Sequence, residues 1–147
     1  CRPVAPLGSC ENPYEIDGFD WYDGNTSDQI SNQFAGCVGA DDAPDHVYRL
    51  RAEGPFEPFP GIDFPVCLTT LGTMFDTVLY VREGGCDGAE IMCGNETVLQ
   101  ANGQQLVYEQ AQITLMIQPE TEYRIFVDGD NGESGPYTLG VINGACD

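Results

Sequence analysis

Short apolar runs separated by Gly, Pro, Asn and Asp make up the chain from about residue 46 onward. Within these runs apolar and polar side chains alternate with period two, and no stretch keeps the 3.6-residue period of an amphipathic helix. In residues 46–52, for example, Tyr48 and Leu50 would point inward. The arginines between and after them would point outward. The pattern therefore predicts an all-β fold.

About eight strands are expected in this part of the chain, joined by turns at residues 119–121 and 128–136 that are rich in Pro, Gly and Asp. This number and spacing are typical of a β-sandwich or a jelly roll. The expected strands cover residues 46–52, 64–71, 76–83, 89–93, 105–118 (as one bent strand or two), 122–128 and 137–142.

The first 45 residues have a different character, because they are rich in Gly, Asp, Asn and Pro and contain only short apolar stretches. They hold too few apolar side chains to form a core of their own. We therefore expect one domain, with residues 1–20 as an extended N-terminal arm and residues 21–147 as the β-sandwich.

The net charge of the chain excludes some classes of binding partner. The chain has 24 acidic residues, five arginines and no lysine, which gives a net charge of −19. A field of this sign repels phosphate backbones and anionic lipids, so we expect no nucleic acid and no membrane-surface partner. No apolar run is long enough for a membrane span. An acidic chain of this kind favours divalent cations.

Seven cysteines with a single histidine, His46, favour disulfide bonds over zinc, and hence a secreted or cell-surface location. Cys86 and Cys93 flank a Gly-containing turn, and we predict that they are bonded to each other. The remaining five cannot all pair within one chain. The alternatives for the odd one are an intermolecular bond, a free buried thiol, or lipid on Cys1, as in a processed lipoprotein; the five are Cys1, Cys10, Cys37, Cys67 and Cys146.

Four stretches taken in order resemble the bacterial pre-peptidase C-terminal domain, a secreted β-sandwich related to the collagen-binding modules of clostridial collagenases. The resemblance spans about residues 37–142, and its most specific part is FDTVLYVR at 75–82 together with VDG at 127–129 and SG-x-YTL at 134–139. The four stretches are residues 37–50, residues 75–81 with 86–93, residues 113–118 leading into 123–129, and residues 134–141. The resemblance implies a non-catalytic domain that accompanies secreted peptidases or surface proteins.

No catalytic site is expected. The only histidine lies beside Asp45, and no Gly-x-Ser-x-Gly elbow or cysteine motif is present. Calcium is the stronger chemical hypothesis, since hard cations need several oxygen ligands. One candidate is the turn with Asp128 and Asp130, although a tight turn in which Asp128 caps backbone amides explains it too. The resemblance implies a second, formed by acids before the first core strand together with an N-terminal segment, and its residues are Asp41, Asp42, Asp45, Glu11, Asn12 and Asp17.

Two further features carry weaker signals. Asn25 and Asn95 each begin an N-glycosylation sequon. Residues 53–65 place Phe56 and Phe59 in a proline-rich connection that is long for a compact sandwich. This loop could grip a partner or fold back over an open end of the core.

Two functions are compatible with these features. The first is a structural protein whose N-terminal arm docks on the sheet edge of the next copy and builds a filament, because the arm has no evident core role and no lysine guards the edges. Its expected apolar anchors are Val4, Leu7, Tyr14 and Ile16.

The second is a targeting module that holds a secreted hydrolase on an insoluble polymer such as collagen or polysaccharide. Tyr14, Trp21 and Tyr22 could stack on sugar rings, although they would fit a wrap over the core as well.

Overall fold

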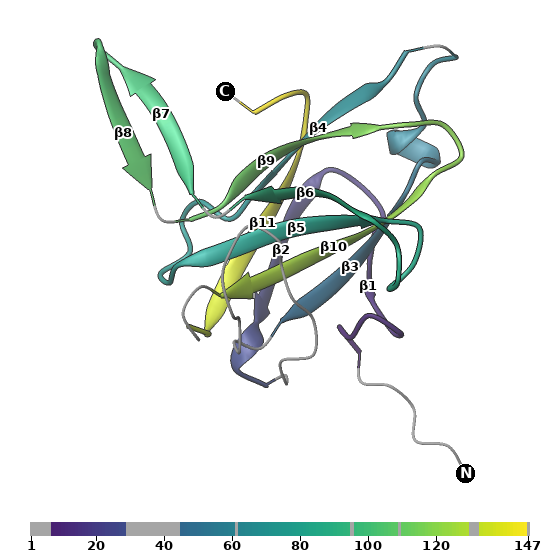
Figure 1. Ribbon diagram of the computed structural model, residues 1–147, viewed down its shortest axis with the longest axis horizontal. Helices are drawn as coiled ribbons and strands as arrows, with labels where there is room; N and C mark the ends of the chain where they lie inside the picture. The colour runs from purple at the N-terminus through teal and green to yellow at the C-terminus, as the bar shows by residue number, and fades with distance from the viewer. Residues whose placement is uncertain are drawn as a thin grey trace.

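The computed structural model describes residues 7–28, 45–60, 62–94, 96–108, 110–129 and 133–146. Its two larger sheets lie face to face, and a two-stranded hairpin stands off from them (Figure 1). Across these ranges no helix has the length and apolar character needed to cross a membrane. The all-β sandwich predicted from the alternation of side chains is confirmed.

One layer is a five-stranded sheet with the strand order β1-β3-β10-β5-β6. Strand β1 runs parallel to β3, and the other neighbours are antiparallel. The strands are β1 (Tyr14–Ile16), β3 (His46–Arg51), β10 (Glu122–Gly129), β5 (Thr77–Glu83) and β6 (Glu90–Gly94).

The second layer is an antiparallel sheet of four strands in the order β2-β11-β4-β9. Two short 3-10 helices, η1 (Thr26–Asp28) and η2 (Gly54–Phe56), lie in the connections. The strands of this layer are β2 (Asp20–Asn25), β11 (Pro136–Asn143), β4 (Phe64–Thr69) and β9 (Gln112–Ile117).

The hairpin consists of β7 (Thr97–Ala101) and β8 (Gln104–Tyr108), which pair only with each other among the described residues. Its two turn residues, Asn102 and Gly103, have φ angles of 52° and 77°. Positive φ at both central positions defines the type I′ turn that suits the twist of a two-residue hairpin, and Asn-Gly is its favoured sequence. The sequence analysis placed no strand at 97–101 and so missed this hairpin.

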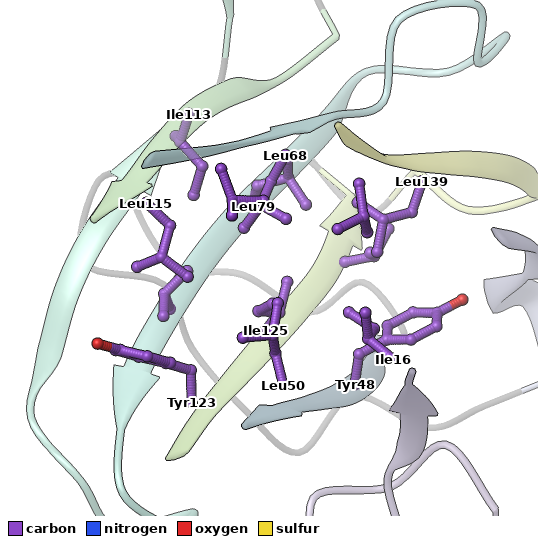
Figure 2. Packing of buried hydrophobic residues seen from close by; sticks show 14 of the residues in the cluster. Ile16, Tyr48, Leu50, Leu68, Leu79, Ile113, Leu115, Tyr123, Ile125 and Leu139 are labelled. Carbon is purple, nitrogen blue, oxygen red and sulfur yellow. The ribbon is translucent and has the colours of Figure 1, made fainter. Parts of the chain in front are cut away.

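The core lies between the two larger sheets. Side chains from the five-stranded sheet meet those of the four-stranded sheet, and Figure 2 shows them pointing toward one another. The largest aliphatic side chains in this layer are almost completely buried; they are Leu50, Leu79 and Ile125 from one sheet and Leu68, Leu115, Ile117 and Leu139 from the other. Of these positions, Leu50 was assigned inward from alternation in the sequence, because a strand buries every second residue.

Residues 7–25 belong to the sandwich, so the prediction that residues 1–20 form a free arm is wrong for the part that the structure describes. Tyr14 and Ile16 lie in β1 opposite Tyr48 and Leu50 of the same chain, and Ile16 is 5% exposed in the core. These two side chains are therefore not free to anchor on another copy. A three-residue strand is too short to produce a visible alternation, which is why the sequence did not reveal it. Val4 lies outside the described residues.

The predicted Cys86–Cys93 disulfide is wrong. Cys86 is bonded to Cys10, with the two Cα atoms 5.7 Å apart. Cys93 lies in β6 opposite Tyr80, three residues beyond Glu90, whereas Cys86 lies in the turn before that strand. Because a cysteine sulfur forms only one disulfide bond, the bond to Cys10 leaves Cys86 unavailable to Cys93.

Two more disulfides involve described cysteines. Cys67 of β4 is bonded to Cys146, with a Cα–Cα distance of 4.9 Å, and this bond fastens the end of the chain to the four-stranded sheet. Cys93 is disulfide-bonded as well. All five cysteines in the described part of the chain are thus oxidised.

The proline-rich loop covers one end of the core. Phe56 is 1% exposed. The centre of its ring lies 4.9 Å from the ring centre of Phe19, and the ring centres of Phe19 and Phe64 are 6.1 Å apart. Of the two roles left open for this loop, Phe56 takes the second and covers the core, so its ring is not available for assembly with a partner. Phe59 is 78% exposed and remains available at the surface.

Candidate functional site

The outer sides of the two sheets differ in exposure. On the four-stranded sheet Trp21, Met116 and Ile142 are 52%, 45% and 40% exposed. The outer side of the five-stranded sheet instead carries a second hydrophobic cluster whose members are fully buried, namely Cys10, Val47, Val78, Tyr80 and Phe126. The outer side of the four-stranded sheet is therefore the open face of the described sandwich.

This open face carries no charge on three of its four strands, β11, β4 and β9. The side chains that alternate with the core positions point outward there, and none of them is acidic or basic. The fourth strand, β2, adds the carboxylate of Asp23, so the face still carries little charge for a chain with a net charge of −19. The outward positions are Thr138, Gly140 and Ile142 on β11, Pro65, Cys67 and Thr69 on β4, and Gln112, Thr114 and Met116 on β9.

The arginines lie on the other layer. Arg49, Arg51, Arg82 and Arg124, the four in the described residues, all belong to strands of the five-stranded sheet. Arg51 Nε and Arg124 Nη1 both bond the Glu122 carboxylate, at 3.1 and 2.5 Å. Burial would raise the pKa of Glu122, but these two arginines and the charge of Arg49 outweigh it and lower that pKa. The arginines of the described sandwich thus lie on the layer away from the open face, where Arg51 and Arg124 pair with Glu122.

Trp21 forms an aromatic platform on the open face. It lies opposite Gly140 in the β2–β11 pair. A Cβ atom on Gly140 would lie 2.5 to 2.9 Å from three carbons of the six-membered indole ring, so the ring rests directly on the glycine backbone. Because about half of the side chain is exposed, one side of the ring faces solvent. A flat, exposed aromatic ring of this kind is suited to stacking on another ring.

Polar groups border this platform along β2. Asp23 Oδ1 accepts a hydrogen bond of 2.9 Å from Thr138 Oγ1. Asp20 Oδ1 accepts one of 2.8 Å from the backbone N–H of Trp21. Toward the other side of the sheet, Thr114 Oγ1 accepts from the backbone N–H of Cys146 at 3.0 Å. The face thus combines an apolar centre with hydroxyl and carboxylate groups at its margin.

A cleft of about 370 Å³ opens at the edge between β1 and β2, beside Trp21. Tyr48 lies at the base of this cleft. The centre of its ring is 5.3 Å from that of Tyr14 and 6.0 Å from that of Tyr22. These two rings therefore pack onto their own core, as the sequence analysis allowed, and Trp21 alone of the three predicted stacking residues points outward. The lining residues are Tyr14, Glu15, Trp21, Tyr22, Asp23 and Tyr48.

A buried hydrogen-bond network lies beneath this cleft and joins the two sheets. The Tyr137 hydroxyl is 2.8 Å from His46 Nδ1 and 2.6 Å from the Tyr48 hydroxyl. Burial, the largest influence, raises the pKa of Tyr48 to about 12. Tyr48 therefore stays protonated at neutral pH and donates or accepts within the network. Since His46 and Tyr48 belong to β3 and Tyr137 to β11, the network links the layers across the core.

The predicted calcium ligands are only partly brought together. Asp45 and Asp128 are buried where β3 begins and β10 nears its end. Asp128 Oδ1 accepts from the backbone N–H of Gly129 at 2.8 Å, the capping role that the sequence also allowed. Glu11 and Asp17 are exposed, and within the described ranges no three His, Cys, Asp or Glu side chains gather as metal ligands would. Asn12 is half-buried, and the remaining candidates, Asp41, Asp42 and Asp130, lie outside the described residues.

Of the two glycosylation candidates, Asn25 is exposed at the end of β2, where its Oδ1 accepts a hydrogen bond of 3.0 Å from the backbone N–H of Ser27. Asn95 lies outside the described residues. Leu7, the remaining predicted anchor in the described part of the chain, is 56% exposed.

Comparison with known proteins finds a likeness among solved structures. No known family profile matches the sequence, and no curated protein matches it. A solved structure that is similar to the chain is the pre-peptidase C-terminal domain of a collagenase from Bacillus anthracis. The TM-score is 0.49 and the sequence identity 12%, with 96% of this chain and 99% of that chain covered. This is the kind of domain to which the sequence resemblance pointed.

The sequence analysis named Trp21 but missed the face on which it lies. The feature that could have indicated this face is the uncharged character of the side chains that alternate with the core positions in residues 137–142. These side chains are Thr138, Gly140 and Ile142. Gly140 has meaning only beside Trp21, and their pairing joins strands from opposite ends of the chain. Such a pairing is not visible in a sequence without knowledge of the sheet order.

Proposed function

We propose that this chain is a non-catalytic extracellular binding module that docks on a neutral polysaccharide through the outer face of the four-stranded sheet. The observation that carries the proposal is the indole of Trp21, held flat on Gly140 with one side exposed. Aromatic rings stack on the apolar face of a sugar ring, while hydroxyl and carboxylate groups such as those of Thr138 and Asp23 bond its hydroxyls.

The charge of the face supports a neutral ligand. A polyanion would be repelled by the net charge of −19, and a polycation would favour the acidic regions over a face that has no charged group on β11, β4 or β9. The disulfide bonds support an oxidising, extracellular location.

Filament formation through a free arm of residues 1–19 does not form part of this proposal, because residues 7–19 belong to the sandwich of their own chain.

The test measures retention of the domain on insoluble cellulose, on chitin and on fibrous collagen. Trp21→Ala should weaken retention on polysaccharide on the order of tenfold or more, since truncating a central aromatic anchor costs about 2 kcal/mol. Phe59→Ala is the matched control, because it removes an aromatic ring that is 78% exposed outside the face. Trp21 is the only tryptophan, so its fluorescence reports directly on binding of soluble oligosaccharides.

The proposal fails if Trp21→Ala, folded by its melting curve, is retained as well as the unaltered domain. It also fails if neither polysaccharide retains the domain. Retention on collagen alone would assign the face to a protein polymer instead.

A further inference from the structure

The β7–β8 hairpin projects from the sandwich, at the upper left of Figure 1. In the described part of the chain its strands pair only with each other. The outer edge of each strand therefore offers a row of backbone N–H and C=O groups for pairing with another strand. A hairpin without a third strand is also marginally stable in water.

Apolar side chains are exposed along this hairpin. Val98 and Val107 lie opposite each other in the strand pair and are 38% and 60% exposed. Leu106 and Tyr108, which alternate with Val107 and so point to the other side, are 41% and 39% exposed. A further strand beside β8 would cover apolar surface on both sides of the ribbon at once.

Charge points to a second copy as the partner. No residue from Thr97 to Tyr108 is charged, whereas the whole chain has a net charge of −19. Two copies repel each other over most of their surfaces, and contact through the hairpins brings neutral segments together. The edge also carries no Lys or Pro, the residues that commonly keep exposed strands from pairing.

Of the two strand edges of the hairpin, the edge of β8 is the more accessible for pairing with another strand. Every side chain of β8 is exposed. On β7, Thr97 is 2% exposed and its hydroxyl donates to the backbone oxygen of Gln110 at 2.7 Å, so the base of that strand is already engaged.

We infer that the hairpin is a self-association element in which β8 pairs antiparallel with β8 of a second copy across a two-fold axis. Leu106 then lies opposite Leu106 of the second copy, and Gln105 opposite Val107. The two hairpins become one four-stranded sheet whose interface is the same on both sides, which closes the assembly as a dimer. This inference does not depend on the proposed polysaccharide site.

The test compares two variants that add the same charge. Val107→Lys puts a cation on β8, and Met74→Lys puts one on a side chain that is 91% exposed in the turn before β5. Size-exclusion chromatography with light scattering should show a dimer for the unaltered chain and for Met74→Lys. Val107→Lys should weaken the association at least tenfold. Because salt screens the repulsion between the copies, dimerisation should strengthen with added NaCl.

Hydrogen exchange supplies a readout that needs no variant. The amides of residues 104–108 should become more protected as protein concentration rises, while those of the core strands stay unchanged. The inference is overturned if the unaltered chain stays monomeric at high concentration and high salt, or if Val107→Lys, with a normal melting curve, dimerises as strongly as Met74→Lys. It is also overturned if protection appears in another segment.

Discussion

At the indole of Trp21, one absent methyl group decides how an aromatic ring lies on the sheet. Gly140 is the residue opposite it, and any Cβ there would collide with the ring. The φ angle of Gly140 is not positive, so the requirement for glycine is one of space and not of backbone conformation. The exposure of Trp21 is thus set by a residue on a neighbouring strand.

Gly140→Ala should lift the indole from the sheet. We expect a loss of stability of about 1–3 kcal/mol from the overpacked contact, together with a red shift of the Trp21 fluorescence as the ring becomes more exposed. Gly18→Ala is the control, because a Cβ at Gly18 meets no atom within 4 Å. Urea denaturation followed by fluorescence measures both effects. Equal stability and identical spectra for the two variants would contradict the close contact described here.

At the scale of elements, the segment before β1 is tied to the sandwich by more than strand pairing. The backbone N–H of Val47 donates to the Gly8 oxygen at 2.7 Å, and Cys10 is bonded to Cys86 in the turn between β5 and β6. The disulfide joins positions 76 residues apart. It therefore restricts the unfolded chain strongly and holds β1 on the edge of the five-stranded sheet.

The double variant Cys10→Ala/Cys86→Ala should lose about 2–5 kcal/mol of unfolding free energy. Both cysteines are replaced so that no free thiol can exchange with the other disulfides. Hydrogen exchange should show the loss first in β1, with β4 and β9 still protected. Peptide mapping of the unaltered chain should find Cys10 linked to Cys86, and a Cys86–Cys93 peptide would refute the assignment.

At the scale of the whole molecule, the strongest long-range force comes from a charge of −19 confined to one small domain. The self-repulsion of this charge opposes the compact state, and added salt weakens the repulsion. Calcium ligation by the acids at 41, 42 and 45 with an N-terminal segment stays a prediction, since two of these three residues lie outside the described part of the chain.

We expect the melting temperature to rise with NaCl, and to rise further with CaCl2 at the same ionic strength if these acids bind the ion. EDTA should then lower it, because a ligand that binds only the folded state stabilises that state. Differential scanning calorimetry at fixed ionic strength separates the two effects. If EDTA has no effect and calcium acts no differently from an equal ionic strength of sodium, the metal prediction is wrong.

The class of fold and most of the inner strands follow from local patterns in the sequence. Alternation is a local property, because successive side chains of a strand point to opposite faces, so Tyr48 and Leu50 could be assigned inward positions without any knowledge of their partners. Composition determined the charge and the number of cysteines, and hence the repulsion of polyanions and the presence of disulfides.

Tertiary structure decided everything that depends on which strands are neighbours. Nearness in the sequence favoured Cys93 as the partner of Cys86, and only the packing of residues 7–12 against the five-stranded sheet gave it Cys10 instead. In the same way, the placement of β1 beside β3 turned a supposed arm into part of the core, and the pairing of β2 with β11 put Trp21 on Gly140. These contacts join residues far apart in the chain, and their energies depend on sheet order, which no local pattern of side chains encodes.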